Sequence, residues 1–474
     1  MFKPFILAIA IVGHSASAQT PDATAEATRI ADIWLESVQA HDRLPALSAA
    51  IVQGENTVLA KGYGTIDTAR TRPATADTLY SICSISKLFT AIALMQQWEQ
   101  GKLRLDDPVT THLPWAQLKP LEGQSMPITV AGILSHGSGL PREADFPYWT
   151  DPANPFPTQA QLRATTPAQT TLFPANTRFQ YSNLGLTLAG ETVEAIARKP
   201  YASVVQQQIL TPLGLADTRS FLPTHLLGTR LAVGWSALKR DGTRDVLPPF
   251  DTRGLASAAG FTSSASDLAR FAQWQLRLLR TEGRQVLKSS TLREMQRVHF
   301  TDPDFKVTRG LGFGIKRRNE QTYVGHSGSC PGYQSILALR PATDTAVTII
   351  NTGSESPTPL ANAIFDLLDK RKAFSFKAAP AATDLGAYIG RYNGQPWSTE
   401  IAVVPWAGGL AMLDLPSRDP VGSLLILTPI APDRFRVIRA DGSEADEVTF
   451  TRTAAGAVAS YTRFQNPRLR IGDL

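Results

Sequence analysis

Residues 80–95 read Tyr-Ser-Ile-Cys-Ser-Ile-Ser-Lys-Leu-Phe-Thr-Ala-Ile-Ala-Leu-Met, a short strand or loop that leads into an apolar helix. Its apolar residues recur at helical spacing on one face, which predicts that this face is buried. Gly101 follows the last apolar turn and is the expected helix stop. Because residues three apart share a helix face, Lys87 should lie beside Ser84, near the positive end of the helix dipole.

Ser84 and Lys87 form a Ser-x-x-Lys pair, the pattern of an activated nucleophile. A serine hydroxyl needs a base, and a lysine becomes one when burial and nearby cations lower its pKa. The alternative is a surface serine beside a lysine that extends into solvent. The same pattern recurs at Ser236 and Lys239, but there it precedes a turn-like Arg-Asp-Gly and opens no amphipathic helix. The context therefore favours Ser84.

Composition and charge exclude several classes of function. The chain has 474 residues, 43 % hydrophobic and 19 % charged, which suffices for two or three domains. Its net charge is +6, but the tight basic clusters, 316–318 and 370–372, are interpreted as solvated surface because no aromatic residues interleave with them. We therefore expect a small-molecule or short-peptide substrate and no nucleic-acid partner. The seven histidines form no paired-ligand motif, so no metal and no cofactor are expected.

The first 18 residues have the pattern of a signal peptide. Lys3 gives a positive start, an apolar run follows, and residues 16–18 (Ala-Ser-Ala) fit a cleavage site. The alternative is an N-terminal anchor helix, but the run is too short to span a bilayer. The sequence predicts a periplasmic or secreted protein without a membrane span in its mature form.

Patterns before residue 373 mix helices and strands. Apolar residues at helical spacing predict further helices at 25–40, 185–198, 266–279 and 359–372. Ser266 and Asp267 are the expected caps of the third. Strands are predicted at 47–53, 57–63, 322–326, 334–340 and 346–351, with the first two forming a hairpin. This order predicts an α+β fold: an antiparallel sheet flanked by helices, with a helical insertion.

The C-terminal part has a different pattern. Turn residues separate seven predicted strands, at 388–393, 400–404, 410–415, 424–430, 434–438, 447–451 and 457–464. This is typical of a small all-β barrel or sandwich. The expected divisions are a signal peptide at 1–18, an α+β domain at 24–372, a linker at 373–383 and an all-β domain at 384–474.

Two further motifs accompany Ser84. Residues 181–183 read Tyr-Ser-Asn before a predicted helix, and residues 326–328 read His-Ser-Gly at the end of a predicted strand. With Ser-x-x-Lys they match the trio of β-lactamases and penicillin-binding proteins. Residues 134–140, Leu-Ser-His-Gly-Ser-Gly-Leu, are similar to a segment of the same group. Over residues 25–372 the chain therefore resembles the class C β-lactamase-like serine hydrolases, which include D-alanyl-D-alanine carboxypeptidases, D-aminopeptidases and esterases.

The resemblance implies how the reaction would run. Ser84 would attack a carbonyl and form an acyl-enzyme, while Lys87 and Tyr181 would share the proton transfers as general base and general acid. The oxyanion would lie between the backbone N–H groups of Ser84 and Ser329. Taken singly, Tyr181 could equally be a buried aromatic residue; the order of the three motifs favours the catalytic interpretation.

The resemblance also implies substrate-binding residues. Asn183 would hold the Lys87 amine or a substrate amide, unless it only caps its helix. His326 would bind a substrate carboxylate or adjust Tyr181, unless it is only a core histidine. Ser327 and Gly328 would complete the binding strand.

The third motif sets the order of the candidate functions. β-Lactamases have a lysine where this chain has His326, and histidine is mostly neutral near pH 7. We therefore expect a hydrolase of small peptides, amides or esters, such as a D-aminopeptidase, carboxypeptidase or esterase. A class C-type β-lactamase is the second hypothesis, and a non-turnover protein that binds penicillin or cell-wall peptides is the third. The nucleophile-elbow pattern of other serine hydrolases is absent from the sequence, since no serine has glycine at both −2 and +2.

Two other expectations rest on the resemblance. Cys83 and Cys330 are the two cysteines of the chain, next to the proposed nucleophile and just past His326. A disulfide between them would tie two walls of one cleft, and its placement resembles a bridge of class A carbapenemases; the alternative is two buried thiols. The all-β domain resembles the lipocalin-like domains of some D-aminopeptidases, which border the site or mediate assembly, although a stabilising appendage is an equal alternative.

Overall fold

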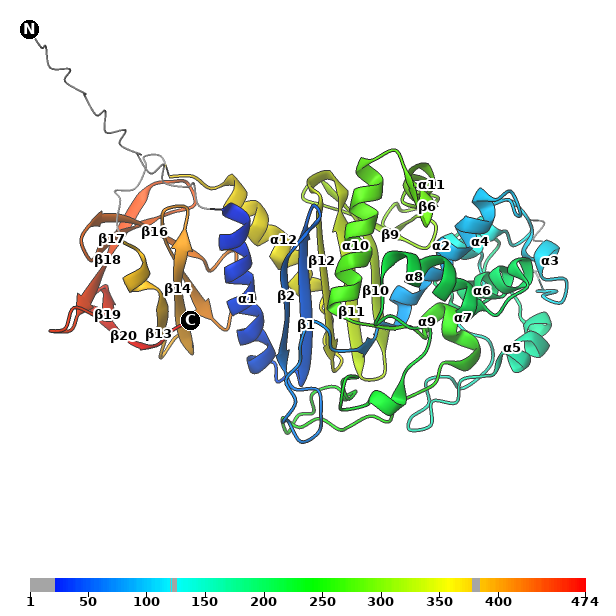
Figure 1. Cartoon of the computed structure of the whole chain (residues 1–474), viewed down its shortest axis with the longest axis horizontal. Helices are drawn as coiled ribbons and strands as arrows, with labels where there is room; N and C mark the ends of the chain where they lie inside the picture. The colour runs from blue at the N-terminus through cyan, green and yellow to red at the C-terminus, as the bar shows by residue number, and fades with distance from the viewer. Residues whose placement is uncertain (1–21, 120, 122–125, 377–383) are drawn as a thin grey trace, which may run out of the picture.

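The computed structural model describes residues 22–119, 121, 126–376 and 384–474 (Figure 1). Its central element is an antiparallel sheet of eight strands in the order β2-β1-β12-β11-β10-β9-β8-β7. These strands are β1 (Ala46–Gln53), β2 (Asn56–Gly64), β7 (Phe300–Thr301), β8 (Thr308–Arg309), β9 (Gly314–Arg318), β10 (Gln321–Cys330), β11 (Tyr333–Arg340) and β12 (Thr345–Thr352). The β1–β2 hairpin therefore lies at one edge of the sheet, where β1 pairs with β12, the last of these strands in chain order. β10 lies nearer the other edge.

Helices cover both faces of the sheet. α1 (Ala23–His41) and α12 (Thr358–Ala373) pack together on one face, and α10 (Ala265–Arg280) crosses the other. β1 and β12 are buried almost throughout because both of their faces are covered. The α+β fold predicted from the sequence is confirmed. One detail is wrong: Ser264 caps α10, accepting a bond from the Asp267 N–H, so the predicted caps lie inside the first turn.

The helical insertion lies beyond β10. Its helices are α2 (Ser86–Glu99), α3 (Val109–His112), α4 (Val130–Ser135), α5 (Gln159–Thr165), α6 (Asn183–Ala197), α7 (Tyr201–Val205), α8 (Thr211–Leu213), α9 (Ala256–Ala259) and α11 (Ser289–Met295). The almost fully buried α2 packs against α6 and α9 in the largest apolar core. A short 3₁₀ turn, η1 (Cys83–Ile85), precedes α2 and contacts β10 and β11, so it lies where the insertion meets the sheet.

The C-terminal part is a closed antiparallel barrel, as the sequence predicted in outline. Its strands are β13 (Gly390–Asn393), β14 (Glu400–Trp406), β15 (Gly409–Leu415), β16 (Leu425–Ala431), β17 (Arg434–Ile438), β18 (Glu444–Arg452), β19 (Val458–Arg463) and β20 (Asn466–Gly472). β20, which pairs with β13 and closes the barrel, was not predicted. The turn before it uses Phe464 and Gln465 at positive φ instead of the usual Asn-Gly, so it carries no sequence signal.

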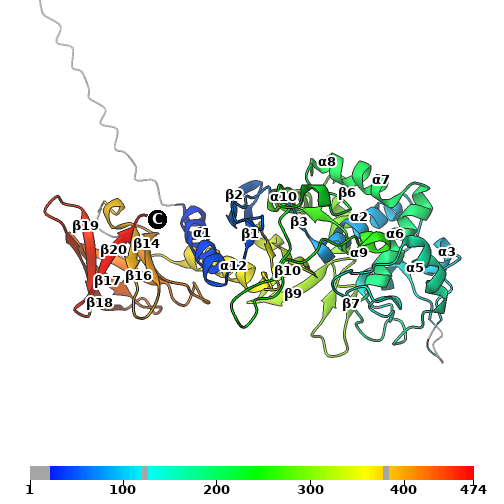
Figure 2. The same cartoon turned by 90° about the horizontal axis from the view of Figure 1, so that it is seen from below.

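The barrel packs on the outer helix layer. Figures 1 and 2 both show α1 and α12 between the barrel and the sheet. Trp34 Nε1 on α1 donates to the Ser417 carbonyl at 2.8 Å, and the Glu26 carboxylate accepts from the Ala407 N–H at 2.8 Å and from Arg371. One apolar cluster spans α1, the sheet face, α12 and the barrel. The expectation that the barrel borders the site therefore finds no support: its contacts are with the helix layer opposite the insertion.

Several predictions fall outside the described residues. The predicted signal peptide lies wholly there, and the predicted linker lies there from residue 377 to residue 383. Among the helices that the structure describes, none is long and apolar enough to cross a membrane. The lipocalin-like character of the barrel and the exact domain boundaries stay predictions.

Candidate active site

Ser84 lies in the η1 turn, directly before α2. Cys83, the preceding residue, has φ of +50°, a left-handed conformation that non-glycine residues rarely adopt. This kink turns the chain from β3 (Tyr80–Ser81) into α2 and leaves Ser84 partly exposed in a pocket. The nucleophile position predicted from the sequence thus coincides with a constrained turn.

Lys87 is 0 % exposed and has all three of its ammonium protons engaged. Its Nζ donates to Ser84 Oγ at 3.1 Å, to Asn183 Oδ1 at 2.7 Å and to the Ala258 carbonyl at 2.8 Å. Burial lowers the pKa of Lys87 from its usual value, while nearby Tyr181 raises it. Ala258 comes from α9 and was not predicted, because a backbone carbonyl leaves no signal in the sequence.

Asn183 is the first residue of α6, and its side chain points into the site instead of capping the helix. Ser182 is the cap, because its hydroxyl accepts from the Gly185 N–H at 2.9 Å. The alternative that Asn183 is only a cap is therefore excluded. Its amide oxygen accepts from Lys87, and its nitrogen donates to Glu143 Oε1 at 2.6 Å.

Tyr181 lies among cations. The Lys87 ammonium lies 4.9 Å from the centre of its ring, and the Arg142 guanidinium carbon lies 5.0 Å from it. The buried His136 ring stacks on Tyr181 at 4.4 Å, and its Nδ1 accepts from the Ser182 N–H at 3.1 Å. His136 belongs to the Leu-Ser-His-Gly-Ser-Gly-Leu segment, which thereby fixes the position of the tyrosine. Cations at these distances are attracted electrostatically to the face of the ring.

His326 is neutral in this environment. It is 7 % exposed, and burial, with the positive charges of Lys87 and Arg309, lowers its pKa to about 3. Its Nδ1 lies 2.6 Å from the Ser327 carbonyl, to which it donates, so Nε2 carries a free lone pair. A neutral imidazole with an unprotonated Nε2 repels a carboxylate, because the lone pair of Nε2 faces the carboxylate oxygens. Of the two predicted roles, this favours the adjustment of Tyr181, whose ring centre is 6.2 Å away.

The predicted binding motif is part of β10, which continues past His326 to Cys330 instead of ending there. β9 pairs with β10 up to Gly325, so the following residues form a free edge toward η1. Gly328 allows the close approach: a Cβ there would lie 2.2 Å from the Ile82 carbonyl oxygen and 3.1 Å from Cys83 Cβ. Ser327 and Ser329 are both exposed to the pocket.

A disulfide joins Cys83 to Cys330, with 5.9 Å between the Cα atoms and a sequence separation of 247. One cysteine directly precedes Ser84 and the other directly follows Ser329. The bond therefore connects the nucleophile turn to the end of β10, beside Ser84 and Ser329, whose N–H groups the family resemblance assigns to the oxyanion.

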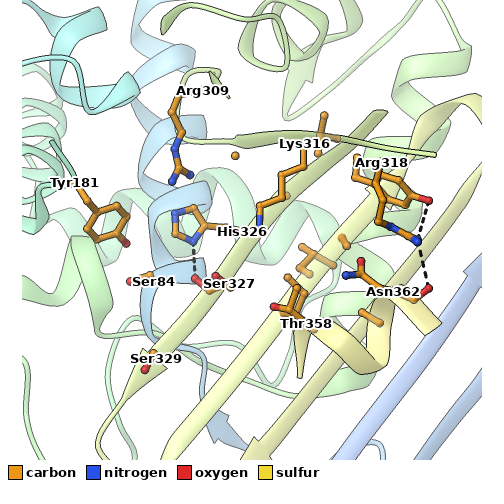
Figure 3. A pocket seen from close by; sticks show the side chains of 18 of the residues that line it. Ser84, Tyr181, Arg309, Lys316, Arg318, His326, Ser327, Ser329, Thr358 and Asn362 are labelled. Carbon is orange, nitrogen blue, oxygen red and sulfur yellow. Dashed lines mark hydrogen bonds between the residues drawn. The ribbon is translucent and has the colours of Figure 1, made fainter. Parts of the chain in front are cut away.

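The site opens into a pocket of about 480 Å³ (Figure 3). Figure 3 shows Ser84, Tyr181 and His326 at one end of the pocket and Arg318, Thr358 and Asn362 at the other, and the lining also has an apolar part. The apolar lining comes from Tyr323, Val324, Ile336, Leu337, Ala338 and Ala361. Cations surround the pocket: Arg142, Arg309, Lys316, Arg317 and Arg318. Among the described residues, no aspartate or glutamate lines it.

Two of these cations have no counterion among the residues that the structure describes. Arg318 pairs with Asp366 and Arg317 with Glu320, but Arg309 and Lys316 form no ion pair within the described chain. Arg309 Nε is buried and has no hydrogen-bond partner there, and burial lowers the pKa of Arg309. Figure 3 shows both side chains extending toward His326. From the sequence, Lys316 was expected on a solvated surface and Arg309 was not predicted to be functional, because neither belongs to a recognisable motif.

No group of three or more metal-ligating side chains is present among the residues that the structure describes. The site instead combines one hydroxyl, one buried amine, one phenol and one neutral imidazole. This set is suited to nucleophilic and general acid–base chemistry.

Comparisons with known proteins agree with this reading. The sequence pattern of the Beta-lactamase family matches residues 32–371. Protein flp of Staphylococcus aureus (strain NCTC 8325 / PS 47) is 25 % identical over 371 residues, which cover 76 % of this chain and 70 % of that protein. The unguisins hydrolase ungD' of Aspergillus campestris (strain IBT 28561) is 27 % identical over 352 residues, covering 69 % and 62 %.

The solved structures show the fold. The octameric penicillin-binding protein homologue from Pyrococcus abyssi superposes with a TM-score of 0.62 at 22 % identity. The superposition covers 93 % of this chain and 99 % of that one, so the likeness includes the barrel. The family match spans both walls of the pocket, from the Ser84 turn to the His326 strand, and the chain belongs to the Beta-lactamase family of serine hydrolases.

Proposed function

We propose that the protein forms an acyl-enzyme on Ser84 and hydrolyses a small peptide, amide or ester. The observation that carries this proposal is the 3.1 Å contact between Ser84 Oγ and the buried amine of Lys87. Because burial lowers the pKa of Lys87, the amine gives up its proton more readily than a lysine in water and then accepts the serine proton.

In acylation, a bond forms between Ser84 Oγ and the substrate carbonyl carbon, and the bond to the leaving group breaks. Lys87 takes the hydroxyl proton, Tyr181 gives its own proton to the departing nitrogen or oxygen, and Lys87 then returns a proton to Tyr181. In deacylation, water adds its oxygen to the acyl carbon and gives a proton to Lys87; the bond to Ser84 Oγ breaks, the acid leaves, and that proton passes to Ser84 Oγ. The position of the Tyr181 ring 4.9 Å from Lys87 Nζ supports this division of roles.

The oxyanion would be bound by the N–H groups of Ser84 and Ser329. The strand register supports the second donor. Cys330 and Tyr333 pair across a two-residue turn, which makes them a hydrogen-bonded pair. Pairs alternate along an antiparallel hairpin, so the Ser329–Gln334 pair is a non-bonded one and the Ser329 N–H points away from β11.

The charge of the pocket supports a substrate that carries a carboxylate. Arg309 and Lys316 carry positive charge that no aspartate or glutamate balances within the described chain. A substrate carboxylate would supply the missing negative charge. An aminopeptidase would instead need an acid for the substrate ammonium group. The pocket therefore favours carboxypeptidase-like or acidic-ester substrates over D-aminopeptidase substrates.

A second candidate, hydrolysis of β-lactams, is favoured by the same observation. The fixed charge that β-lactamases take from a lysine in the third motif is available here from Arg309 and Lys316, although His326 is neutral. We further propose that the protein acts in the periplasm or outside the cell, which the disulfide supports.

The test compares wild type with Ser84→Ala on four substrates: a p-nitrophenyl ester, a chromogenic cephalosporin, D-alanine p-nitroanilide, and an acyl dipeptide with a free carboxylate. We expect turnover of the ester and the dipeptide, with loss of activity in Ser84→Ala. Equal activity of both proteins on every substrate contradicts the Ser84 assignment. Stoichiometric labelling of Ser84 without turnover, read by mass spectrometry, would instead identify a binding protein.

A matched pair isolates the charge preference. The acyl dipeptide and its C-terminal amide differ in one charge, and we expect the acid to have the higher kcat/KM. Arg309→Met should lower the ratio of kcat/KM for the acid to kcat/KM for the amide by about tenfold or more. This is the effect of losing one charge-assisted hydrogen bond of about 1.5–3 kcal/mol. Equal ratios in both proteins would contradict recognition by Arg309.

A further inference from the structure

Glu143 lies behind the catalytic end of the pocket, in the segment that follows residues 134–140. Its Oε1 accepts from Asn183 Nδ2 at 2.6 Å and from Trp149 Nε1 at 3.1 Å. Glu143 does not line the pocket and belongs to none of the three motifs. It contacts Asn183, which contacts Lys87, so it is two hydrogen bonds from the proposed base.

The chemistry of the amide makes this contact directional. An asparagine side chain has an oxygen that accepts and a nitrogen that donates, and it can rotate to exchange them. The Lys87 ammonium only donates, so it needs the oxygen. An ionised carboxylate only accepts, so Glu143 holds the nitrogen. Glu143 thereby selects the one orientation of Asn183 in which the oxygen faces Lys87.

We propose that Glu143 is a positioning residue that fixes Lys87 through Asn183 and balances its positive charge. This inference rests on the proposed role of Lys87 as the base. The lysine amine must stay 3.1 Å from Ser84 Oγ through the proton transfer, and Asn183 and the Ala258 carbonyl are its other anchors. If Asn183 rotated, its nitrogen would face the ammonium and release it from this geometry.

Charge gives the proposal a second, measurable consequence. The Glu143 carboxylate raises the pKa of Lys87, against the larger effect of burial. Burial also raises the pKa of Glu143, while its bonds from Asn183 and Trp149 lower it. The other charged or titratable groups around Lys87 are Tyr181, Arg142, His136 and His326. Glu143 is the one carboxylate among the described groups that affect the pKa of Lys87.

Two variants separate charge from orientation. Glu143→Gln keeps the shape and an accepting oxygen but removes the charge, so the acid limb of the kcat/KM profile should move to lower pH. Glu143→Leu removes the acceptor as well, and kcat on the plateau should fall about tenfold, the equivalent of about one hydrogen bond. Glu191→Gln is the matched control, because Glu191 is also buried with a raised pKa, but it is held by Arg163 outside the pocket. It should leave the profile unchanged.

A readout without substrate keeps the test independent of the proposed function. The Lys87 amine can be titrated by NMR in lysine-labelled protein, with Lys87→Met to assign its signal. We expect the Lys87 signal to titrate at lower pH in Glu143→Gln and at the wild-type pH in Glu191→Gln. If Ser84 proved not to be the nucleophile, this shift would still establish the contact from Glu143 to Lys87.

The outcomes are distinct. A purely structural Glu143 would lower the melting temperature of its variants while the Lys87 titration and the pH profile stayed as in wild type, and that result would overturn the proposal. If Glu143→Leu failed to fold, the Lys87 titration in Glu143→Gln would decide the charge effect, because that variant preserves both accepted hydrogen bonds.

Discussion

The chain contains the Ser-x-x-Lys pattern twice, and the two copies have opposite chemistry. Ser84 lies 3.1 Å from a lysine that is 0 % exposed. Ser236 donates to the Ala237 carbonyl at 2.9 Å and accepts from the Asp245 N–H at 2.8 Å. The Lys239 side chain is 45 % exposed and turns to Asp245, 2.8 Å away.

The difference shows what converts a serine beside a lysine into a nucleophile. Asp245 raises the pKa of Lys239, so that amine retains its proton. Burial lowers the pKa of Lys87, whose partners are a neutral amide, a carbonyl and the serine itself. Spacing along a helix brings the two side chains together, but desolvation without an acidic contact makes the lysine a base.

The sharpest test of this comparison exchanges each lysine for methionine. Lys87→Met should lower kcat/KM for a p-nitrophenyl ester by about 10³, within the range of general-base catalysis. Lys239→Met should leave it unchanged, because that amine is exposed and far from any reacting group. Steady-state kinetics with both variants and circular dichroism as a folding check provide the measurement. Similar losses in both would mean that burial does not distinguish the two copies.

The sequence predicted the elements that carry a strong period or a motif. The α2 helix, the β1–β2 hairpin and strands β10 to β12 follow from apolar spacing and from the turn residues between the strands. The order of the three motifs along the chain also predicted that Ser84, Tyr181 and His326 share one site, and all three line the same pocket. These features could be predicted because local spacing and burial agree.

What was missed depends on contacts between distant segments. Arg309 and Lys316 lie on short strands, β8 and β9, and act through an unbalanced charge, which the linear sequence does not display. The Ala258 carbonyl contacts Lys87, and Glu143 contacts Asn183, only after folding. β20 has exposed residues and no clean alternation, so only barrel closure reveals it.

The disulfide is a second feature that Ser84 has and Ser236 lacks. The double variant Cys83→Ser/Cys330→Ser should lose about 2–4 kcal/mol of unfolding free energy, as for other long loops. Its kcat should fall about tenfold, since the bond joins the neighbours of both proposed oxyanion donors. Denaturant titration and ester kinetics measure the two effects. A reductant should cause the same losses of stability and kcat in wild type and no further loss in the variant. Full activity of the reduced wild type would contradict the predicted fall in kcat.

A smaller effect concerns the wall opposite Ser84. Because the pKa of His326 is lowered to about 3, the unfolded chain binds a proton between about pH 3 and 6.5 that the folded protein does not. Stability should therefore fall as pH drops below about 6.5, and His326 should account for about 2 kcal/mol between pH 7 and pH 5.

His326→Gln should remove that part of the slope in denaturant titrations at the two pH values. His225→Gln is the control, because His225 is exposed on the surface. Parallel slopes in wild type and His326→Gln would mean that His326 binds its proton at the same pH in the folded and unfolded protein, which contradicts a lowered pKa and leaves open its predicted role in binding a carboxylate at acidic pH.

The smallest effect is expected at the second serine. Ser236→Ala removes a hydroxyl whose two bonds are both local, and Asp245 N–H, which loses its acceptor, lies at an exposed residue where water replaces it. Unfolding free energy should change by about 0.5 kcal/mol or less, and ester turnover should equal that of wild type. An active-site serine probe should label wild type and Ser236→Ala equally and spare Ser84→Ala. Loss of labelling in Ser236→Ala would mean that an exposed, ion-paired lysine can activate a serine. The distinction between the two Ser-x-x-Lys copies would then fail.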